Sequence, residues 1–162
     1  SNTLDKVNDH YLQINSDYIG CVDDTCLATG ELLPVKDTPF DFNKRKRIGQ
    51  DLEADHIQLK NAFGYDHSFV LNGTENQLTL EEPVSGRRLI ISTTAPVVQV
   101  YTGNFLKDGC IGKAGRVYEN REGVALETQL MPNAINTEEN PSTILRKGDK
   151  FESNTKYVFE IM

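Results

Sequence analysis

The chain has 162 residues and a formal net charge of −7, and this length suits one domain or part of one. A phosphate backbone attracts proteins with a surplus of Lys and Arg, so the acidic balance argues against a nucleic-acid partner. The one basic run, Lys44–Arg47, has Asp41, Asp51 and Glu53 around it, and we interpret it as a solvated loop.

The cysteine spacing and the hydropathy argue against a disulfide-rich, a zinc-binding and a membrane-spanning protein. Cys21, Cys26 and Cys110 are an odd set without regular spacing, which does not predict a disulfide framework. Cys21 and Cys26 face no second Cys/His pair, so a zinc site is not expected, and we expect reduced thiols in a cytoplasmic protein. No apolar run approaches the ~18 residues that would span a membrane, and the N-terminus shows no signal segment.

Short runs of β-branched and aromatic residues, separated by turn residues, predict a mostly β protein. In chain order, the first six expected strands are Tyr11–Ile14, His67–Leu71, Gln77–Glu82, Arg87–Thr94, Val97–Thr102 and Val124–Met131. Helical spacing is weak: Ile48–Phe63 fits an irregular helical turn as well as a loop. Many short strands without alternating βαβ units favour an all-β sandwich or barrel.

Two hairpins are expected. Asn72-Gly73 lies between two β-like runs and predicts a tight hairpin turn. In the tail, Ile144–Arg146 would enter a second hairpin and Lys147–Asp149 would turn it. Strict alternation through Tyr157, Phe159 and Ile161 predicts the closing strand.

Glu127 is the carboxylate that stands out, because it lies within Val124–Met131, an otherwise apolar strand. A charge there must face solvent, a partner or a cleft, since an unpaired buried carboxylate is costly. Burial would raise its pKa and make it a better base near neutral pH. An ordinary outward-facing strand position remains open, because a period of two residues permits it.

Two Asp-His pairs are weaker candidates. In Asp66-His67 and Asp9-His10 the carboxylate can hold the imidazole in one tautomer, and each pair can equally be a turn Asp beside a surface His. The sequence contains no G-x-S-x-G elbow, P-loop, H-E-x-x-H motif or EF-hand loop. These absences exclude several enzyme classes and identify none.

Read together, the local motifs resemble the aldose 1-epimerase family, in order and over nearly the whole chain. The segment Gly64–Phe69 is similar to the family's G-Y/F-D-H-x-F motif, and Gln99–Leu106 is similar to V-Q-F-Y-T-G-N-F-L. Further matching blocks are Asn8-Asp9-His10, Thr29-Gly30-Glu31, Thr38-Pro39-Phe40-Asp41-Phe42, Ser85-Gly86-Arg87, Leu126-Glu127-Thr128-Gln129, Pro141-Ser142 and Leu145–Asp149.

The resemblance implies a large antiparallel β-sandwich of about twice this length, of which residues 1–162 would form the C-terminal half, with the N-terminal half absent. A polar start and an end on a strong strand agree with such a piece. The family's reaction interconverts the α and β anomers of free hexoses such as galactose and glucose. It uses general acid–base ring opening and reclosure and needs no cofactor or metal.

The resemblance also implies site residues. Glu127 matches the catalytic base of the family's L-E-T-Q block, Asp66 the carboxylate that accepts bonds from sugar hydroxyls, and Gln99 the amide that lines the same pocket. His67 is not transferred as catalytic, and a structural role is expected for it.

The chain departs from the family pattern at several positions. Asp37 and Val97 stand where the family usually has Gly, Val100 where it often has an aromatic, and Asn133 where Asp is common. The changes at Val97, Val100 and Asn133 are expected to reshape the pocket or its support, and with it the sugar preference. The family's acid is a His in an upstream N-H-x-Y-F segment that this chain lacks. We therefore expect the isolated chain to have little activity, and the resemblance implies the N-terminal half of the fold as a partner.

Two other classes stay open at this point. A non-catalytic sugar-binding or sensor module of the same fold would lose little affinity on Glu127→Gln, whereas an enzyme would lose turnover and keep the sugar. A structural β-sandwich with protein partners would gain no thermal protection from any sugar.

Overall fold

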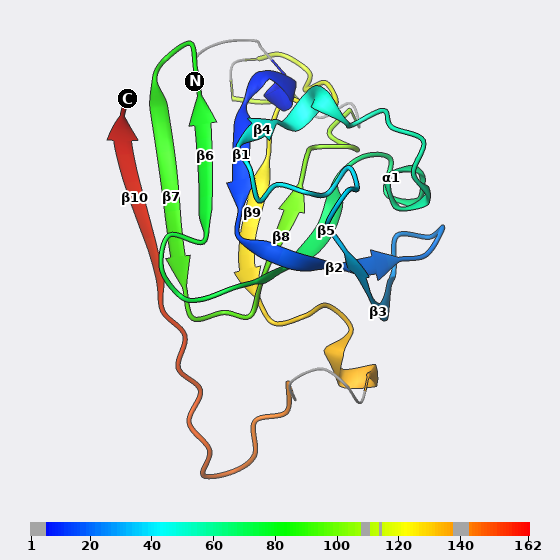
Figure 1. Ribbon diagram of the computed structural model, residues 1–162, viewed down its shortest axis with the longest axis vertical. Coiled ribbons are helices and arrows are strands. Elements are labelled where there is room, and N and C mark those ends of the chain that lie inside the picture. Colours follow the sequence, from blue (N-terminus) through cyan, green and yellow to red (C-terminus); the bar gives the residue numbers. More distant parts are fainter. Residues whose placement is uncertain (1–5, 108–110, 114, 138–142) are drawn as a thin grey trace.

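The computed structural model describes residues 6–107, 111–113, 115–137 and 143–162. Two five-stranded antiparallel sheets form a β-sandwich, as expected (Figure 1). The first sheet has the order β10-β7-β6-β1-β4 and the second β3-β2-β5-β8-β9. The strands of the first sheet are β1 (Tyr11–Ile14), β4 (Lys46–Arg47), β6 (Leu78–Glu82), β7 (Arg87–Thr93) and β10 (Thr155–Ile161). Those of the second are β2 (Ser16–Val22), β3 (Ala28–Pro34), β5 (Asp66–Leu71), β8 (Val97–Tyr101) and β9 (Ala125–Gln129).

The core lies between the two sheets. Because side chains alternate across a strand, each strand contributes every second residue. The first sheet supplies Leu12, Leu78 and Ile91, and the second supplies Phe69 and Val98, all almost fully buried. Helices are few and short: η1 (Val7–Asp9), η2 (Ile48–Gln50), α1 (Ile57–Asn61) and η3 (Ala134–Asn136). Among the described residues, no helix is long and apolar enough to cross a membrane.

The prediction of a hairpin is wrong at both places. After β5 the chain crosses through Asn72-Gly73 to β6, which belongs to the other sheet, so this turn is a connection between sheets. Ile144–Arg146 forms no strand, although residues 147 and 148 do turn. β10 instead pairs along its whole length with β7, from Thr155 opposite Thr93 to Ile161 opposite Arg87.

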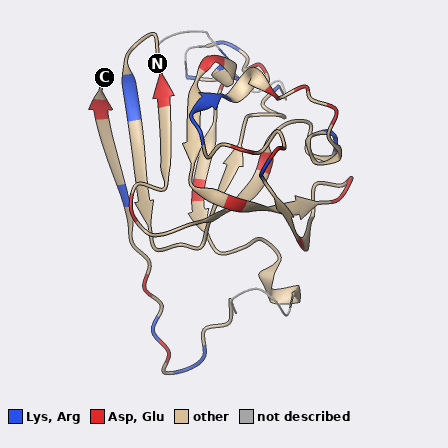
Figure 2. Ribbon diagram, in the orientation of Figure 1, with Lys and Arg blue, Asp and Glu red and all other residues tan. Residues whose placement is uncertain are grey.

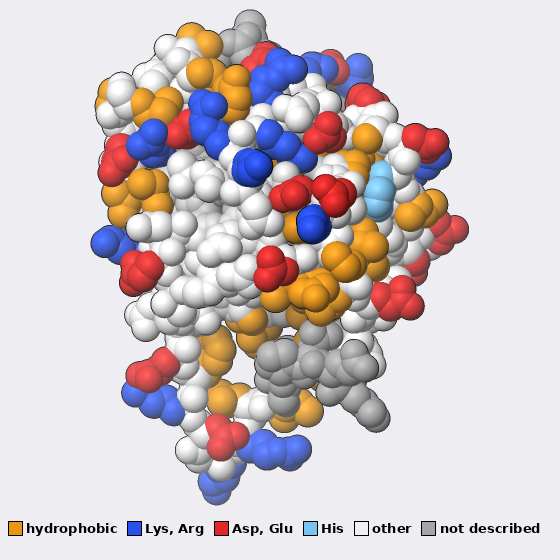
Figure 3. Space-filling view, in the orientation of Figure 1, with side chains coloured by type: hydrophobic (Ala, Val, Ile, Leu, Met, Phe, Trp, Pro, Cys, Tyr) orange, Lys and Arg blue, Asp and Glu red, His pale blue; other side chains and the backbone are white. Residues whose placement is uncertain are grey.

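Acidic segments lie near the basic run, as the red and blue stretches of ribbon around β4 in Figure 2 show. Arg45 pairs with Glu81 at 2.5 Å, Lys46 with Asp51 at 2.8 Å and Arg47 with Asp9 at 2.9 Å. On the face in Figure 3 the basic side chains therefore lie among acidic ones. Of the cysteines, Cys21 is buried and Cys26 partly buried, and both are free, whereas Cys110 and the Pro141-Ser142 block lie outside the described residues.

One feature of the first sheet is an apolar face without cover. Tyr157 lies opposite the core residue Ile91, and Phe159 lies opposite Leu89, so β10 extends the inner face of the sheet. Yet Phe159 is 77% and Ile161 75% exposed. We call Tyr157, Phe159 and Ile161 the β10 apolar face. It continues the core surface beyond the second sheet.

Candidate functional site

The candidate site lies on the outer face of the second sheet. Register places Ser68 of β5 opposite Gln99 of β8, and Gln99 opposite Glu127 of β9. Residues directly opposite one another point to the same face, so these three side chains form one row across three strands. Asp66 begins β5 two residues before Ser68 and shares this face. The structure thus brings the three sequence-predicted residues, Asp66, Gln99 and Glu127, together.

These side chains line an open hollow of about 480 Å³. Its lining is formed by Asp66, Gln99, Tyr101, Phe105, Glu127, Gln129 and Pro132. A smaller hollow beside it, of about 80 Å³, is lined by Asp66, Ser68, Gln99, Cys26 and others. Glu127 itself is exposed to solvent within this open hollow.

A hydrogen-bonded relay fixes the polar groups of the hollow. Gln99 Nε2 donates to Asp66 Oδ1 at 2.7 Å, and Ser68 Oγ donates to Gln99 Oε1. The orientation of the Gln99 amide is therefore set at both ends, because its nitrogen must face the carboxylate. Half-burial raises the pKa of Asp66, and the hydrogen bond from Gln99 lowers it in part.

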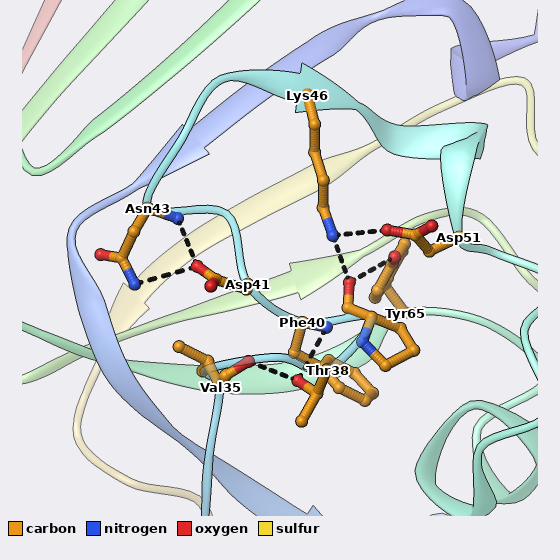
Figure 4. Close-up of polar contacts among 9 residues, drawn as sticks. Val35, Thr38, Phe40, Asp41, Asn43, Lys46, Asp51 and Tyr65 are labelled. Atoms are coloured by element: carbon orange, nitrogen blue, oxygen red, sulfur yellow. Dashed lines mark hydrogen bonds and ion pairs between the residues drawn. The ribbon is translucent and has the colours of Figure 1, made fainter.

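The Thr38–Phe42 segment anchors the start of β5 (Figure 4). Tyr65, the residue before Asp66, is buried, and its hydroxyl donates to the Pro39 carbonyl at 2.9 Å. Lys46 Nζ donates to the same carbonyl at 2.7 Å and pairs with Asp51. Burial of the Tyr65 phenol raises its pKa. The buried Tyr65 side chain and its hydrogen bond to Pro39 thus fix the backbone just before Asp66.

His67 is fully buried on the opposite face of β5 from Asp66. Its ring packs edge-on against Phe40, with 4.7 Å between the ring centroids. Burial, together with the nearby His56, lowers the pKa of His67 to about 3, which keeps the imidazole neutral. Its Nδ1 accepts a hydrogen bond from the Asp66 backbone N–H at 3.1 Å. The expected structural role of His67 agrees with this position.

Sequence reasoning missed Ser68, Tyr101 and Gln129, which share the outer face. The signal was present, because each lies two residues from an expected site residue on the same strand and must therefore point the same way. Tyr101 also accepts a hydrogen bond at its hydroxyl from the Phe105 backbone N–H at 2.9 Å, which holds Phe105 beside the hollow.

The chain that follows β9 covers part of the outer face of the second sheet, next to Val70 and Val97. Met131 and Ala134 pack on Val97 and Val70 in a small second cluster. This cover ends beside the hollow, where Pro132 forms part of the lining. Within the described ranges, no group of three or more His, Cys, Asp or Glu side chains is placed to hold a metal ion.

Fold and site together define an antiparallel β-sandwich with a polar hollow of carboxylates and amides on the outer face of one sheet. A family model described as "Aldose 1-epimerase" matches residues 1–158. The chain belongs to the aldose 1-epimerase family.

Curated relatives and solved structures agree with this membership. The chain is 38% identical to a galactose mutarotase of Homo sapiens over 96% of its own length and 45% of the relative's. It is 35% identical to an aldose 1-epimerase of Escherichia coli, over 94% and 45% of the two chains. A crystal structure of an aldose epimerase homologue from C. elegans superposes with a TM-score of 0.88 at 30% identity, over 99% of this chain and 48% of that one. The chain thus spans about half the length of the curated relatives that it matches.

Proposed function

We propose that the hollow is a hexose site and that the chain is the C-terminal half of an aldose 1-epimerase. The enzyme would interconvert the α and β anomers of free hexoses such as galactose and glucose. The observation that carries the proposal is the alignment of Glu127 with Gln99 across β9 and β8, beside an Asp66 carboxylate bonded to Gln99. Because its two described thiols are free, we expect a reducing compartment, the cytoplasm.

In this proposal Glu127 is the base. Its carboxylate removes the proton from the anomeric hydroxyl while an acid protonates the ring oxygen, and the bond between the anomeric carbon and the ring oxygen breaks. The open-chain aldehyde rotates about its first carbon–carbon bond. The ring oxygen then attacks the other face, and both protons return, so the reaction is balanced without a cofactor. Asp66 and Gln99 hold sugar hydroxyls in place through their remaining lone pairs and N–H group.

The acid is proposed to come from the N-terminal half of the fold. Among the residues that line the hollow of Glu127 there is no histidine, and His67 is buried in the core. The β10 apolar face favours the proposal that further strands belong to the fold. Phe159 and Ile161 continue the core surface of the first sheet, yet both are largely exposed. Further strands of a larger sandwich would cover this face.

Polarimetry with freshly dissolved α-galactose or α-glucose tests the proposal. We expect the isolated chain to accelerate mutarotation little, since a missing acid removes roughly 10²–10⁴-fold of rate. Co-expression with the upstream half of a homologous mutarotase should restore turnover, and Glu127→Gln should abolish the restored turnover while sugar binding persists. High turnover by the isolated chain would contradict the assignment of the acid. Restored turnover that survives Glu127→Gln would contradict the assignment of the base.

A non-catalytic sugar-binding module is the second candidate, favoured by the lack of a histidine in the lining of the hollow. It retains the same relay of Ser68, Gln99 and Asp66. In a thermal-shift titration with galactose, such a module keeps its protection in the Glu127→Gln variant and shows no turnover in any complex with an upstream half. A structural sandwich would show no protection by any sugar.

A further inference from the structure

A further hollow lies apart from the relay of Asp66 and Gln99 and has a volume of about 770 Å³, within the usual range of ligand sites. It lies between the α1 region and the loops that follow β8 and precede β9. Its walls include Glu53, Asp55 and Lys60 on one side, and Asn104, Asn120 and Arg121 on the other. Phe105 lines both this hollow and the one that contains Glu127.

Two exposed phenylalanines form an aromatic rim. Phe63 is 61% and Phe105 51% exposed, and their rings meet edge to face with centroids 5.4 Å apart. Phe63 has a φ of 54°, a left-handed conformation that is rare for a bulky side chain. Strained residues of this kind concentrate at ligand sites, where the surrounding structure holds them in place. Here Arg121 Nη2 donates to the Phe63 carbonyl at 2.5 Å.

The guanidinium of Arg121 lies half-buried in the wall without an acidic partner among the described residues. Its Nη1 donates to Thr102 Oγ1 at 3.1 Å and to Asn104 Oδ1, and all of its acceptors are neutral. Burial lowers the pKa of Arg121, and the charge of Glu53, which lines the same hollow, raises it in part, but the two side chains form no ion pair. The hollow thus presents a cation and an anion that do not neutralise one another by contact.

This arrangement selects a class of ligand. An anion attracted by Arg121 would meet Glu53 and Asp55, and a cation attracted by them would meet Arg121 and Lys60. A hydroxyl group both donates and accepts, so adjacent hydroxyls can bridge a carboxylate and a guanidinium. The C–H face of a pyranose ring can rest on an exposed aromatic ring. We infer that this hollow is a second carbohydrate site, which takes a neutral pyranoside between Glu53 and Arg121 with its apolar face on Phe63.

The inference does not rest on the proposed mutarotase activity, and its test needs no turnover. Methyl β-galactopyranoside cannot open its ring, so it reports binding alone. Titrated into the ¹⁵N-labelled chain, it should shift the side-chain amide signals of Asn104 and Asn120. Signals of Gln99 report the other hollow separately. The inference would be overturned if the two asparagine amide signals stayed unshifted up to roughly 100 mM glycoside, because a dissociation constant above that concentration is too weak for a specific site.

A matched pair of variants locates the contact. Phe63→Asn removes the ring and suits the left-handed backbone, so the variant should fold, whereas Leu27→Asn removes an equally exposed apolar side chain outside the hollow. Phe63→Asn should weaken binding at the asparagine amides about tenfold, and Leu27→Asn should leave it unchanged. Equal affinity in both variants would overturn the inference. A titration in which inorganic phosphate shifts these amides and the glycoside does not would also overturn it.

Discussion

The Asp66 carboxylate, which we propose to bind sugar hydroxyls, lowers the stability of the fold at neutral pH. Its half-buried position raises the pKa, so at neutral pH the folded protein holds a charge that the unfolded chain holds more easily. A raised carboxyl pKa contributes stability below the unfolded pKa and loses it as the pH rises through the folded pKa. Near pH 7 the ionised Asp66 therefore opposes folding.

Asp66→Asn should for this reason raise the free energy of unfolding at pH 7, by less than about 1 kcal/mol because the group is half-exposed and screened. Urea denaturation at pH 7 and pH 3 measures the effect, and the gain should vanish at pH 3, where both states are protonated. Asp17→Asn, at an exposed position of β2, is the control. A loss of stability at pH 7 would show that the carboxylate supports the fold. Sugar binding should weaken in either case, if Asp66 holds hydroxyls.

The four residues that depart from the family pattern lie outside the lining of the hollow of Glu127. Val97 is buried under Met131 in the small second cluster, and Val100 is buried in the main core, so neither lines the hollow of Glu127. Asp37 and Asn133 both adopt left-handed backbone, with φ of 60° and 59°. Asp and Asn tolerate this conformation better than most residues, which explains how Asp37 replaces a usual glycine. The lining of the described hollow therefore keeps the expected Asp66, Gln99 and Glu127.

Among the elements, β10 carries exposed apolar side chains that we expect to drive self-association of the isolated chain. Replacing both Phe159 and Ile161 by Thr keeps β-propensity and removes most of this surface. The double variant should be less associated in sedimentation velocity, with a free energy of unfolding lower by only about 1 kcal/mol, because both side chains are already exposed. Leu27→Thr, an exposed position outside β10, should change neither quantity. A large loss of stability would mean that β10 is already covered.

Local pattern predicted most strands, because alternation and β-branched residues are local signals. It correctly indicated β1, β5 to β9 and the closing strand β10. It missed the two-residue β4, which lies in the basic run that was interpreted as a loop. It also missed β2 and β3: β2 contains Ser16, Asp17 and Gly20, and β3 contains Gly30 and ends on Pro34, so both look like turns. The segment 48–63, which fitted an irregular helical turn as well as a loop, contains η2 and the five-residue α1.

Strand pairing, in contrast, is decided by contacts distant in the sequence. Asn-Gly favours a tight turn, but the same turn serves a hairpin or a crossing between sheets. Here β6 pairs with β1 and β7 and not with β5. The candidate site residues Asp66, Gln99 and Glu127 could be predicted because they lie in recognisable blocks, and their roles stay a prediction. The relay through Ser68 and the hollow at Phe63 depend on register and loop packing, which no local pattern contains.

For the whole molecule, the buried neutral His67 should dominate the first stage of acid destabilisation. Its pKa is about 3 in the fold, and an exposed His titrates near 6.5, so the unfolded chain gains a proton that the fold excludes. A lowered His pKa gives stability that is present above pH 6.5 and is lost as the pH falls toward 3. The slope is at most about 1.4 kcal/mol per pH unit.

Chemical denaturation at intervals between pH 6.5 and 4.5 measures this slope. His67→Gln retains an acceptor for the Asp66 backbone N–H and removes the titration, so its stability should be nearly constant over this range, whatever its absolute value. The buried carboxylates of Glu81 and Glu82, whose pKa values are lowered by hydrogen bonds, contribute their own losses of stability only at lower pH. An unchanged slope in His67→Gln would show that another group controls acid unfolding.

In β5, β8 and β9, strict alternation places successive side chains on opposite faces of the sheet, one facing the core and the other facing outward. His67, Phe69, Val98, Val100 and Leu126 belong to the interior, while Asp66, Gln99, Tyr101, Glu127 and Gln129 line the hollow that we propose to be the hexose site. A change at one set need not disturb the other, so recognition can diversify while the scaffold is inherited intact. A combinatorial library confined to Ser68, Tyr101 and Gln129 should therefore yield mostly folded proteins with altered ligand preference.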